Sequence, residues 1–217
     1  MDKYINKIIC GDCLDIMCDM PDKCVDLVLT DPPYGVDIGN QSQGKGGVAI
    51  KIDYGINDWD KRPPTKDVFK ELFRISKNQI IFGGNYFVEH LKTSPCWIIW
   101  NKDNGESDFA DCELAWTSFN SAVRIIKYRW AGMLQQKGVK KEKRVHPTQK
   151  PVGVMEWILN NYSKKNDIIL DAYLGSGTVA IACKKLNRKY IGIEQEKKYC
   201  DIAEKRLSAV QPFLNFG

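Results

Sequence analysis

The residues best suited to chemistry in this sequence are Asp31-Pro32-Pro33-Tyr34, which directly follow the apolar run Asp26 to Thr30. That run is short, uninterrupted and rich in branched side chains, as expected of a fully buried strand. Two consecutive prolines then prevent a helix and remove two backbone donors, so their carbonyl groups stay available at the carboxyl end of the strand. An acid, free carbonyls and an aromatic ring suit a planar group that carries an amine, because the oxygens accept its hydrogen bonds and the ring stacks on it. The tetrapeptide alone is also explained by a strand followed by a proline turn with a surface Tyr.

A second segment has the composition of a ligand-binding turn: Asp171-Ala172-Tyr173-Leu174-Gly175-Ser176-Gly177-Thr178. It follows a predicted buried strand and opens a predicted helix. The glycines let the backbone turn sharply and approach a ligand closely. The helix N-terminus favours negative charge, here a carboxylate rather than a phosphate, since no Gly-Lys-Ser/Thr sequence is present.

The next predicted strand ends at Glu194. An acid at this position commonly accepts hydrogen bonds from the two hydroxyl groups of a ribose. The glycine turn and this acid together predict a nucleoside cofactor. The spacing of the glycines does not fit G-x-G-x-x-G, which disfavours a nicotinamide dehydrogenase.

Composition indicates a soluble globular protein of one domain, or one domain with a large insertion. The chain has 217 residues, 43% of them hydrophobic and 27% charged. It has no apolar stretch of membrane-spanning length and does not begin like a signal peptide, so we expect a cytoplasmic protein. The eight cysteines are expected to be reduced and mostly in the core. Cys10 and Cys13 lack the second pair that a structural zinc site needs, so no metal is predicted.

The elements that must position these residues alternate between strands and helices, which predicts an α/β fold with a mainly parallel sheet. Short apolar runs predict strands at Ile8–Cys10, Leu27–Leu29, Gln79–Phe82, Cys96–Trp100, Cys112–Trp116, Ile168–Leu170 and Tyr190–Ile193. Arg124 to Trp130 alternates and is expected to form an extra hairpin strand outside the main sheet. Helical spacing predicts helices at Cys13–Met20, Asp67–Ile75, Pro151–Tyr162, Thr178–Leu186 and Glu196–Leu207. Residues 35–61 read as a long loop on the catalytic side.

Several of these short segments, in this order, resemble the DNA amino-methyltransferases that use S-adenosylmethionine. The resemblance is to the permuted branch, in which the catalytic motif precedes the cofactor motif. It rests on Gly11-Asp12, Asp31 to Tyr34, Gly83-Gly84-Asn85, His146-Pro147-Thr148-Gln149-Lys150-Pro151, Asp171 to Thr178, and Ile191 to Glu194. One departure is that Ala172 and Tyr173 stand where relatives often carry Pro and Phe.

The resemblance implies one methyltransferase domain over residues 1–217, a Rossmann-like α/β fold with seven mostly parallel strands and helices on both faces. The Ile168 strand would be central, with the Tyr190 strand beside it and the Ile8 strand beyond. The Leu27, Gln79, Cys96 and Cys112 strands would form the substrate half. The two ends of the chain would meet in the cofactor half, and the catalytic tetrapeptide would lie where the halves join.

The resemblance also implies roles for individual residues. Asp31, Pro32, Pro33 and Tyr34 would be catalytic, and the target base would flip out of the duplex to stack on Tyr34. The cofactor S-adenosylmethionine would be bound at its ribose by Glu194, beside its adenine by Asp12, and at its methionine portion by the 171–178 turn with His146 and Lys150. For two of these residues a purely structural role remains open: His146 equally fits a positioned loop residue, and Tyr173 fits a core residue.

The expected reaction is attack of an exocyclic amine on a sulfonium methyl group. Asp31 and the Pro32 carbonyl would hold the two N–H bonds, localise the nitrogen lone pair and stabilise the developing positive charge. The first residue of the tetrapeptide, Asp, resembles the adenine-N6 enzymes; the cytosine-N4 enzymes of this branch more often carry Ser there. Adenine is therefore favoured, with cytosine as the alternative.

Target recognition is expected within residues 118–145, where much of the net charge of +5 gathers. Base contacts would come from Arg, Gln135 or Gln136 and phosphate contacts from Lys. The candidate DNA-binding residues are Arg124, Lys127, Arg129, Lys137, Lys140, Lys141, Lys143 and Arg144. A solvated basic loop explains the same charges. The short segment predicts a short recognition site, relaxed specificity or a homodimer, and a cognate restriction enzyme is a further partner of such enzymes.

Two rival functions use the same residues. One is a non-catalytic DNA-binding protein on a methylase scaffold, which the intact acid and proline pair argue against. The other is an S-adenosylmethionine enzyme that acts on RNA or on a protein amide, which the motif order and the basic segment disfavour.

Overall fold

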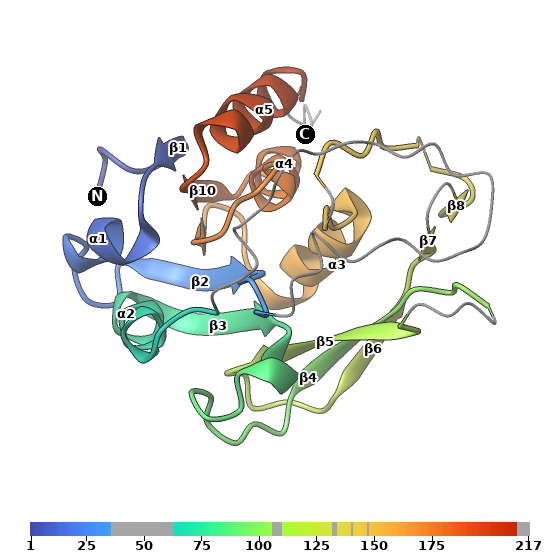
Figure 1. Ribbon diagram of the computed structural model, residues 1–217, viewed down its shortest axis with the longest axis horizontal. Coiled ribbons are helices and arrows are strands. Elements are labelled where there is room, and N and C mark those ends of the chain that lie inside the picture. Colours follow the sequence, from blue (N-terminus) through green and yellow to red (C-terminus); the bar gives the residue numbers. More distant parts are fainter. Residues whose placement is uncertain (36–62, 106–109, 132–133, 140, 147, 212–217) are drawn as a thin grey trace.

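In this computed structural model, eight strands form one sheet in the order β1-β10-β9-β2-β3-β5-β4-β6 (Figure 1). The structure describes residues 1–35, 63–105, 110–131, 134–139, 141–146 and 148–211. Its elements are β1 Lys7–Cys10, α1 Cys13–Cys18, β2 Val25–Thr30, α2 Lys66–Ile75, β3 Ser76–Phe82, a 3₁₀ turn Gly84–Tyr86, β4 Trp97–Asn101, β5 Cys112–Thr117, β6 Arg124–Lys127, β7 Trp130–Ala131, β8 Leu134–Gln135, α3 Val152–Tyr162, β9 Ile168–Asp171, α4 Thr178–Lys185, β10 Lys189–Glu194 and α5 Lys197–Ser208.

Within this sheet only β5 runs against the other strands. β1, β10, β9, β2 and β3 are paired in parallel, β5 is antiparallel to both β3 and β4, and β6 is parallel to β4. The mainly parallel α/β fold is confirmed, as are the central position of β9 with β10 and β1 beyond it, and the grouping of β2, β3, β5 and β4.

The sheet has one strand more than expected, and this corrects the placement of Arg124 to Trp130. Arg124–Lys127 pairs in parallel with β4 as the outermost strand of the main sheet. Only Trp130–Ala131 lies outside it, in a two-stranded ribbon with β8. Alternation predicts a half-exposed strand but does not identify its partner, so the sequence pattern could not decide between the two sheets.

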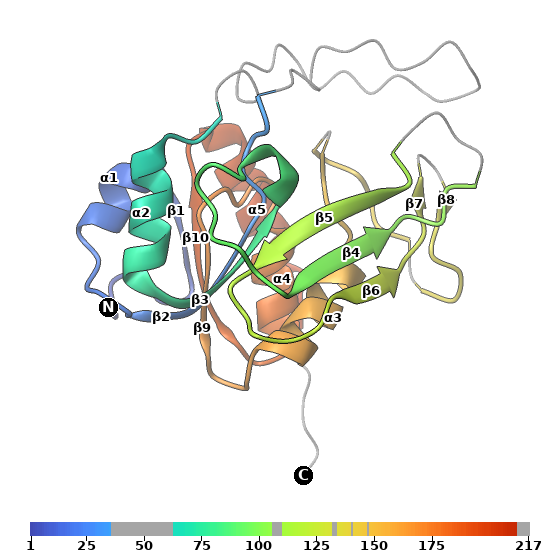
Figure 2. The same ribbon diagram turned by 90° about the horizontal axis from the view of Figure 1, so that it is seen from below.

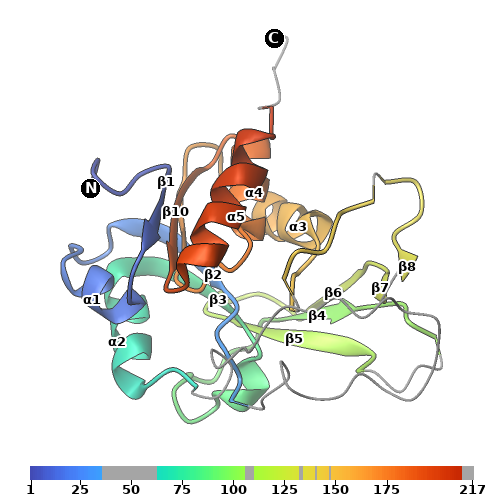
Figure 3. The ribbon, with the colours of Figure 1, turned by 45° about the horizontal axis from the view of Figure 1, so that its top comes forward.

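Helices cover both faces of the sheet (Figure 2). On β2, Leu27 and Leu29 pack in the cluster that contains α3, α4 and α5, whereas Val28 packs with α1 and α2. Strand side chains alternate between the two faces, so an uninterrupted apolar run is what a strand covered on both sides requires. Figure 3 shows β1 beside β10 with α5 packed near them, so the two ends of the described chain meet in one half of the molecule.

All eight cysteines are free thiols, but only half of them lie in the core. The buried ones are Cys13, Cys96, Cys183 and Cys200. The expectation that most are core residues was therefore too strong. Among the described residues, no group of three or more His, Cys, Asp or Glu is arranged to hold a metal ion. In the same part of the chain, no helix is long and apolar enough to span a bilayer.

Candidate active site

The predicted site residues follow the carboxyl ends of four adjacent parallel strands. β1, β10, β9 and β2 are neighbours that run in one direction. Their carboxyl ends therefore share one edge of the sheet, the usual place for ligands in open α/β folds. That edge brings together Asp12, Glu194, Asp171 and Asp31, which are far apart in the sequence.

A cavity of about 810 Å³ lies at this edge and is lined by both predicted motifs. This volume falls in the range of about 300–1,000 Å³ typical of small-molecule sites. The predicted cofactor residues that line it are Asp12, Asp31, His146, Lys150, Asp171, Ala172, Tyr173, Gly175, Ser176, Thr178 and Glu194. Gly177 does not line it. A Cβ at Gly177 would lie 2.9 Å from Cβ of Ala203, so this glycine serves the packing of α4 against α5.

Asp31 is held through both of its carboxylate oxygens. The hydroxyl of Tyr34 donates to Oδ1 at 2.7 Å, and Lys150 Nζ donates to Oδ2 at 2.5 Å. Burial raises the pKa of Asp31, although the positive charge of Lys150 opposes this. Burial and the neighbouring Asp31 carboxylate also raise the pKa of Tyr34, so the phenol remains a donor to Asp31 at neutral pH.

Lys150, predicted to lie by the methionine portion of the cofactor, lines the cavity. In the described structure its Nζ forms ion pairs with Asp31 at 2.5 Å and with Glu113 at 2.9 Å. The rings of Phe82 and Tyr34 lie 5.2 and 6.0 Å from Nζ. Burial disfavours the charged ammonium, but the two carboxylates raise the pKa of Lys150 above its ordinary value.

Two residues of this cluster, Glu113 and Lys102, were not predicted from the sequence. Glu113 lies on β5 and pairs with Lys102 at 2.8 Å as well as with Lys150. Burial alone would raise the pKa of Glu113, but Lys150 and Lys102 lower it below the ordinary value. The available signal was a charged residue inside an otherwise mainly apolar predicted strand, because such residues are rarely buried without a partner.

Gly83 and Tyr86 determine where the Tyr34 ring lies. Gly83 has a positive φ of 66°, and a Cβ there would lie 2.1 Å from Cε1 of Tyr34. The Cβ would also be 2.6 and 2.7 Å from the two adjoining ring carbons, which places the glycine over the face of the ring. Tyr86, half-exposed, stacks on Tyr34 with ring centroids 4.7 Å apart. The Gly83-Gly84-Asn85 segment thus makes room for the ring of Tyr34.

Asp171 links the two motifs. Thr30 Oγ1, the residue before Asp31, donates to Asp171 Oδ1 at 2.8 Å, and the backbone N–H of Tyr173 donates to the same oxygen at 3.2 Å. Burial raises the pKa of Asp171 to about 7, and the nearby carboxylates of Asp31 and Glu194 contribute in the same direction.

Glu194 and Asp12 anchor the turns that surround the cavity. The N–H of Gly175 donates to Glu194 Oε2 at 2.7 Å, and the N–H of Glu196 donates to Oε1 at 2.9 Å. Asp12 caps α1 by accepting from the N–H of Leu14 at 2.7 Å. A carboxylate oxygen has two lone pairs, so each acid keeps acceptor capacity for a ligand hydroxyl or amine.

His146 is a neutral residue beside the glycine turn. Burial, followed by the positive charges of Lys150 and Lys198, lowers the pKa of His146 to about 4. The N–H of Thr148 donates to Nδ1 at 3.3 Å, which assigns the ring hydrogen to Nε2. A Cβ on Gly175 would lie 3.9 Å from Nε2, so the ring borders this turn. These contacts fit both a positioned loop residue and a ligand donor.

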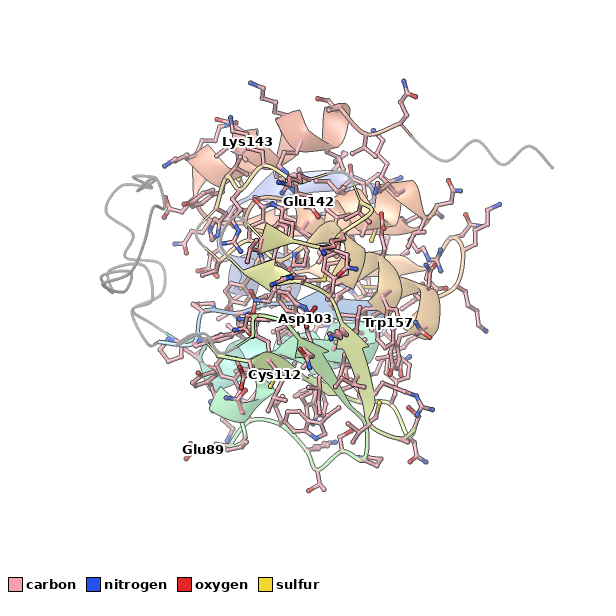
Figure 4. The ribbon with its side chains drawn as sticks, turned by 90° about the vertical axis from the view of Figure 1, so that its right-hand side faces the viewer. Glu89, Asp103, Cys112, Glu142, Lys143 and Trp157 are labelled. Carbon is pink, nitrogen blue, oxygen red and sulfur yellow. The ribbon has the colours of Figure 1, made fainter. Side chains whose placement is uncertain are left out.

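Most of the predicted DNA-binding cations are exposed: two lie on β6 and the others on the segment that follows β8, where Figure 4 labels Lys143. The exposed ones are Arg124, Lys127, Lys137, Lys141 and Lys143. Arg129 and Arg144 are partly buried, and Arg144 packs over the Trp130 ring at 4.7 Å. Lys140 lies outside the described residues, as does the predicted loop 35–61 apart from Gly35.

Gln135 and Gln136 were candidates for base contacts, and in the described structure both form hydrogen bonds within residues 118–145. Gln135 bonds to the backbone N–H and carbonyl of Glu142, each at 2.8 Å. Gln136 Oε1 accepts from the N–H of Arg129 at 3.1 Å. Their role in the described structure is to hold the segment in shape.

Comparison with known proteins gives a consistent result. The sequence profile of the DNA methylase family, which covers N6 and N4 methyltransferases, matches residues 87–205. The type II methyltransferase M.HinfI of Haemophilus influenzae is 31% identical over 264 residues, covering 98% of this chain and 71% of its own length. The type II methyltransferase M2.LlaDCHI of Lactococcus lactis subsp. cremoris is 30% identical over 227 residues, covering 85% of this chain and 82% of its own.

Solved structures are similar over nearly the whole chain. The M1.HpyAVI–SAM complex has a TM-score of 0.58 and 26% identity, covering 93% of this chain and 98% of that one. The cytosine-N4-specific PvuII DNA methyltransferase has a TM-score of 0.62, 12% identity and coverage of 96% and 88%. At that identity the second likeness concerns the fold alone.

Proposed function

This chain belongs to the DNA methylase family of N6-adenine and N4-cytosine methyltransferases, and from that premise we propose that it methylates the exocyclic N6 amine of adenine in DNA, with S-adenosylmethionine as methyl donor. The observation that carries the proposal is the shared cavity: Asp31 and the 171–178 turn line the same 810 Å³ space. A carboxylate that can accept a hydrogen bond from an amine is therefore next to a turn suited to a nucleoside cofactor.

The charges of the cavity fit a cationic cofactor. Its lining has five acids and two lysines, and His146 is neutral at physiological pH. The acids are Asp12, Asp31, Asp171, Glu194 and Glu196, and the lysines are Lys150 and Lys198. Opposite charge favours the ionised form of a buried acid, so a bound cation would relieve the raised pKa of Asp171. S-adenosylmethionine carries a sulfonium and an amino group, and also a carboxylate that the N-terminus of α4 would favour.

Each part of the donor has a matching group on this chain. Glu194 would accept from the ribose hydroxyls while its oxygens stay fixed by Gly175 and Glu196. Asp12 would lie by the adenine, with its orientation set by the cap to Leu14. The 171–178 turn and His146 would receive the methionine portion.

Asp31 would accept a hydrogen bond from the target amine, and the Pro32 carbonyl would accept the other. Directed in this way, the two N–H bonds draw the nitrogen toward tetrahedral geometry and localise its lone pair, which is otherwise delocalised into the base. When bound, S-adenosylmethionine supplies an electrophilic methyl carbon, whose bond to sulfur breaks as the nitrogen attacks. Asp31 stabilises the positive charge that develops on nitrogen, and it is the nearest base to take the proton that the product amine releases. Tyr34 keeps the carboxylate oriented throughout.

A base inside a duplex cannot reach this cavity, so the target adenine would flip out. Tyr34 would then provide the stacking surface, although in the described structure its ring stacks on Tyr86. Either the base packs against the remaining surface of Tyr34, or Tyr86 moves aside to admit it.

The test is methylation of DNA with isotope-labelled donor, followed by identification of the labelled nucleoside. We expect N6-methyladenine; label in N4-methylcytosine would overturn the adenine assignment and leave the family assignment intact. Asp31→Asn keeps the side-chain shape but removes the charge, and we expect it to slow transfer by roughly 10²–10³-fold. Cofactor affinity, measured calorimetrically, should be retained.

Asp26→Asn is the matched control for this variant. Asp26 lies on β2, the strand that leads to Asp31. Its side chain is 27% exposed against 22% for Asp31, but it pairs with Lys77 away from the cavity. We expect it to keep its activity. Substantial transfer by Asp31→Asn would refute the role of this carboxylate.

A further inference from the structure

Behind Asp31 lies a row of four charged side chains that alternate in sign. Lys150 Nζ is 2.5 Å from Asp31 Oδ2 and 2.9 Å from Glu113 Oε2, and Lys102 Nζ is 2.8 Å from Glu113 Oε1. Two cations and two anions give the row a formal charge of zero. All four side chains are largely shielded from solvent, with Lys150 only 8% exposed.

Lys150 is shared unequally between its two carboxylates. It donates a hydrogen bond to Asp31. Oε2 of Glu113 is buried and 2.9 Å from the same ammonium, yet among the described residues no well-aligned hydrogen bond reaches it. An ammonium has three N–H groups, so a small rotation or shift of Nζ is enough to fill this acceptor.

This arrangement conflicts with the task assigned to Asp31. Oδ1 accepts from Tyr34 and Oδ2 from Lys150, so an incoming amine that approaches Oδ2 from the side now occupied by Nζ competes with a buried cation. An ammonium that gave up Asp31 without another partner would be a costly isolated charge. Glu113 supplies that partner at a distance of 2.9 Å.

We propose that Glu113 is a positioning residue for methyl transfer, which takes over Lys150 when the target amine displaces this ammonium from Asp31. The inference rests on the proposed function, because it requires an amine that binds Asp31. Lys150 stays within its buried site between the two carboxylates and beside the Phe82 ring. Lys102 keeps the Glu113 carboxylate paired in both states, so the row remains neutral while the contact moves.

The electrostatics of Glu113 support this role. Despite burial, the two lysines lower the pKa of Glu113, so it is an anion across the physiological range and ready to receive the ammonium. Asp31 has one lysine and an opposing acid, and burial raises the pKa of Asp31. The pKa of Glu113 is thus lowered and that of Asp31 raised, a difference that favours Glu113 as the ion-pair partner of Lys150.

The experiment measures single-turnover methyl transfer at saturating donor and DNA in Glu113→Gln. The amide keeps the size of the side chain but holds an ammonium weakly, so Lys150 stays on Asp31. We expect the rate constant to fall by about 10- to 100-fold, the scale of a misplaced catalytic group, with donor affinity unchanged. The melting temperature should fall, because Lys102 loses its carboxylate partner, and the transfer assay is therefore run well below it. Glu113→Asp keeps the charge at a shorter reach, and we expect a loss of about fivefold.

Glu71→Gln is the matched control, because Glu71 is similarly shielded at 18% exposure and pairs with Arg74 outside the cavity. It should transfer at the wild-type rate. If Glu113→Gln does not fold, Glu113→Asp against Glu71→Asp carries the test, with a loss expected only in the first.

The outcomes separate this inference from the function on which it rests. Wild-type transfer with an equally fast Glu113→Gln overturns the inference and leaves the function standing. A loss explained by weaker donor binding, or an equal loss in both Glu113 variants, also overturns it. Absence of transfer by the wild-type chain overturns the proposed function and this inference together.

Discussion

Asp171 carries a burial cost that its hydrogen bonds from Thr30 and Tyr173 do not remove. Burial raises its pKa to about 7 from an ordinary value of 3.8. An acid with a raised folded-state pKa contributes stability that is fully present below its unfolded pKa and is lost as pH rises through the folded pKa. Asp171 should therefore make the protein less stable as the pH rises from about 4 to about 7.

Asp171→Asn keeps an oxygen that accepts from Thr30 and removes this titration. Between pH 5 and pH 8, the wild-type free energy of unfolding should fall by about 2–3 kcal/mol more than that of the variant. Urea denaturation at the two pH values measures the difference. The comparison with the variant is needed because the lowered pKa of His146 acts in the opposite direction.

Asp26→Asn provides the control, because the pKa of Asp26 is lowered overall: burial raises it, and the Ile168 N–H and Lys77 more than offset this. Asp26 is ionised in both states above pH 5, so this variant should show the wild-type pH dependence. Equal pH dependence of Asp171→Asn and the wild type would show that the folded acid is ionised at neutral pH.

The acids and glycines of the site could be predicted because each belongs to a short local pattern: a strand, then a turn residue. Glu113 and Lys102 could not, since their importance comes from contact with Lys150, which only the tertiary structure reveals. For the same reason the sequence indicated a cofactor contact for Lys150 but not its protein partners. The local sequence indicates which element carries a polar side chain, but not which group that side chain contacts in the folded chain.

At the scale of elements, the turn after β3 positions the ring of Tyr34. Gly83→Ala would place a methyl group 2.1 Å from Cε1 of Tyr34, so the ring must move, and with it the hydroxyl that orients Asp31. We expect methyl transfer to fall by about 10- to 100-fold, with cofactor binding kept, as measured by single-turnover kinetics and calorimetry.

Gly105→Ala separates this contact from backbone strain. Gly105 has nearly the same φ, +67° against +66°, but a Cβ there meets nothing within 4 Å. Both variants should lose stability of about 1 kcal/mol from the positive φ, and only Gly83→Ala should lose activity. Equal activity in the two would mean that Tyr34 does not need its observed place.

The elements themselves were largely predictable. The five helices and the strands of the sheet from β1 to β5, with β9 and β10, follow from apolar spacing, because each is covered by a core that dictates the pattern. β6 has only one buried residue, Ile126, so its sequence carried too little information to identify β4 as its partner. The order of the central strands came from the resemblance, not from periodicity.

At the scale of the whole molecule, two pairs of exposed lysines allow a test of the predicted DNA-binding segment, residues 118–145. Lys141 and Lys143 are exposed on the segment that leads to His146 and the cavity (Figure 4). Lys164 and Lys165 are equally exposed, but they precede β9, at the end of that strand away from Asp171. The two pairs have the same charge and differ in their position relative to the proposed site.

If the recognition segment binds phosphates, the double variant Lys141→Gln/Lys143→Gln should bind DNA more weakly than the wild type, to a similar extent for all sequences. Each lost phosphate contact lowers the slope of log K against log salt by about 0.9, so we expect a decrease of about 1.8. Fluorescence anisotropy with short duplexes across a salt series measures both quantities. Lys164→Gln/Lys165→Gln should keep the wild-type slope, since it removes the same charge from the end of β9 that lies away from Asp171. Identical slopes in the two double variants would mean that the segment is a solvated basic loop, and that DNA approaches the cavity from another side.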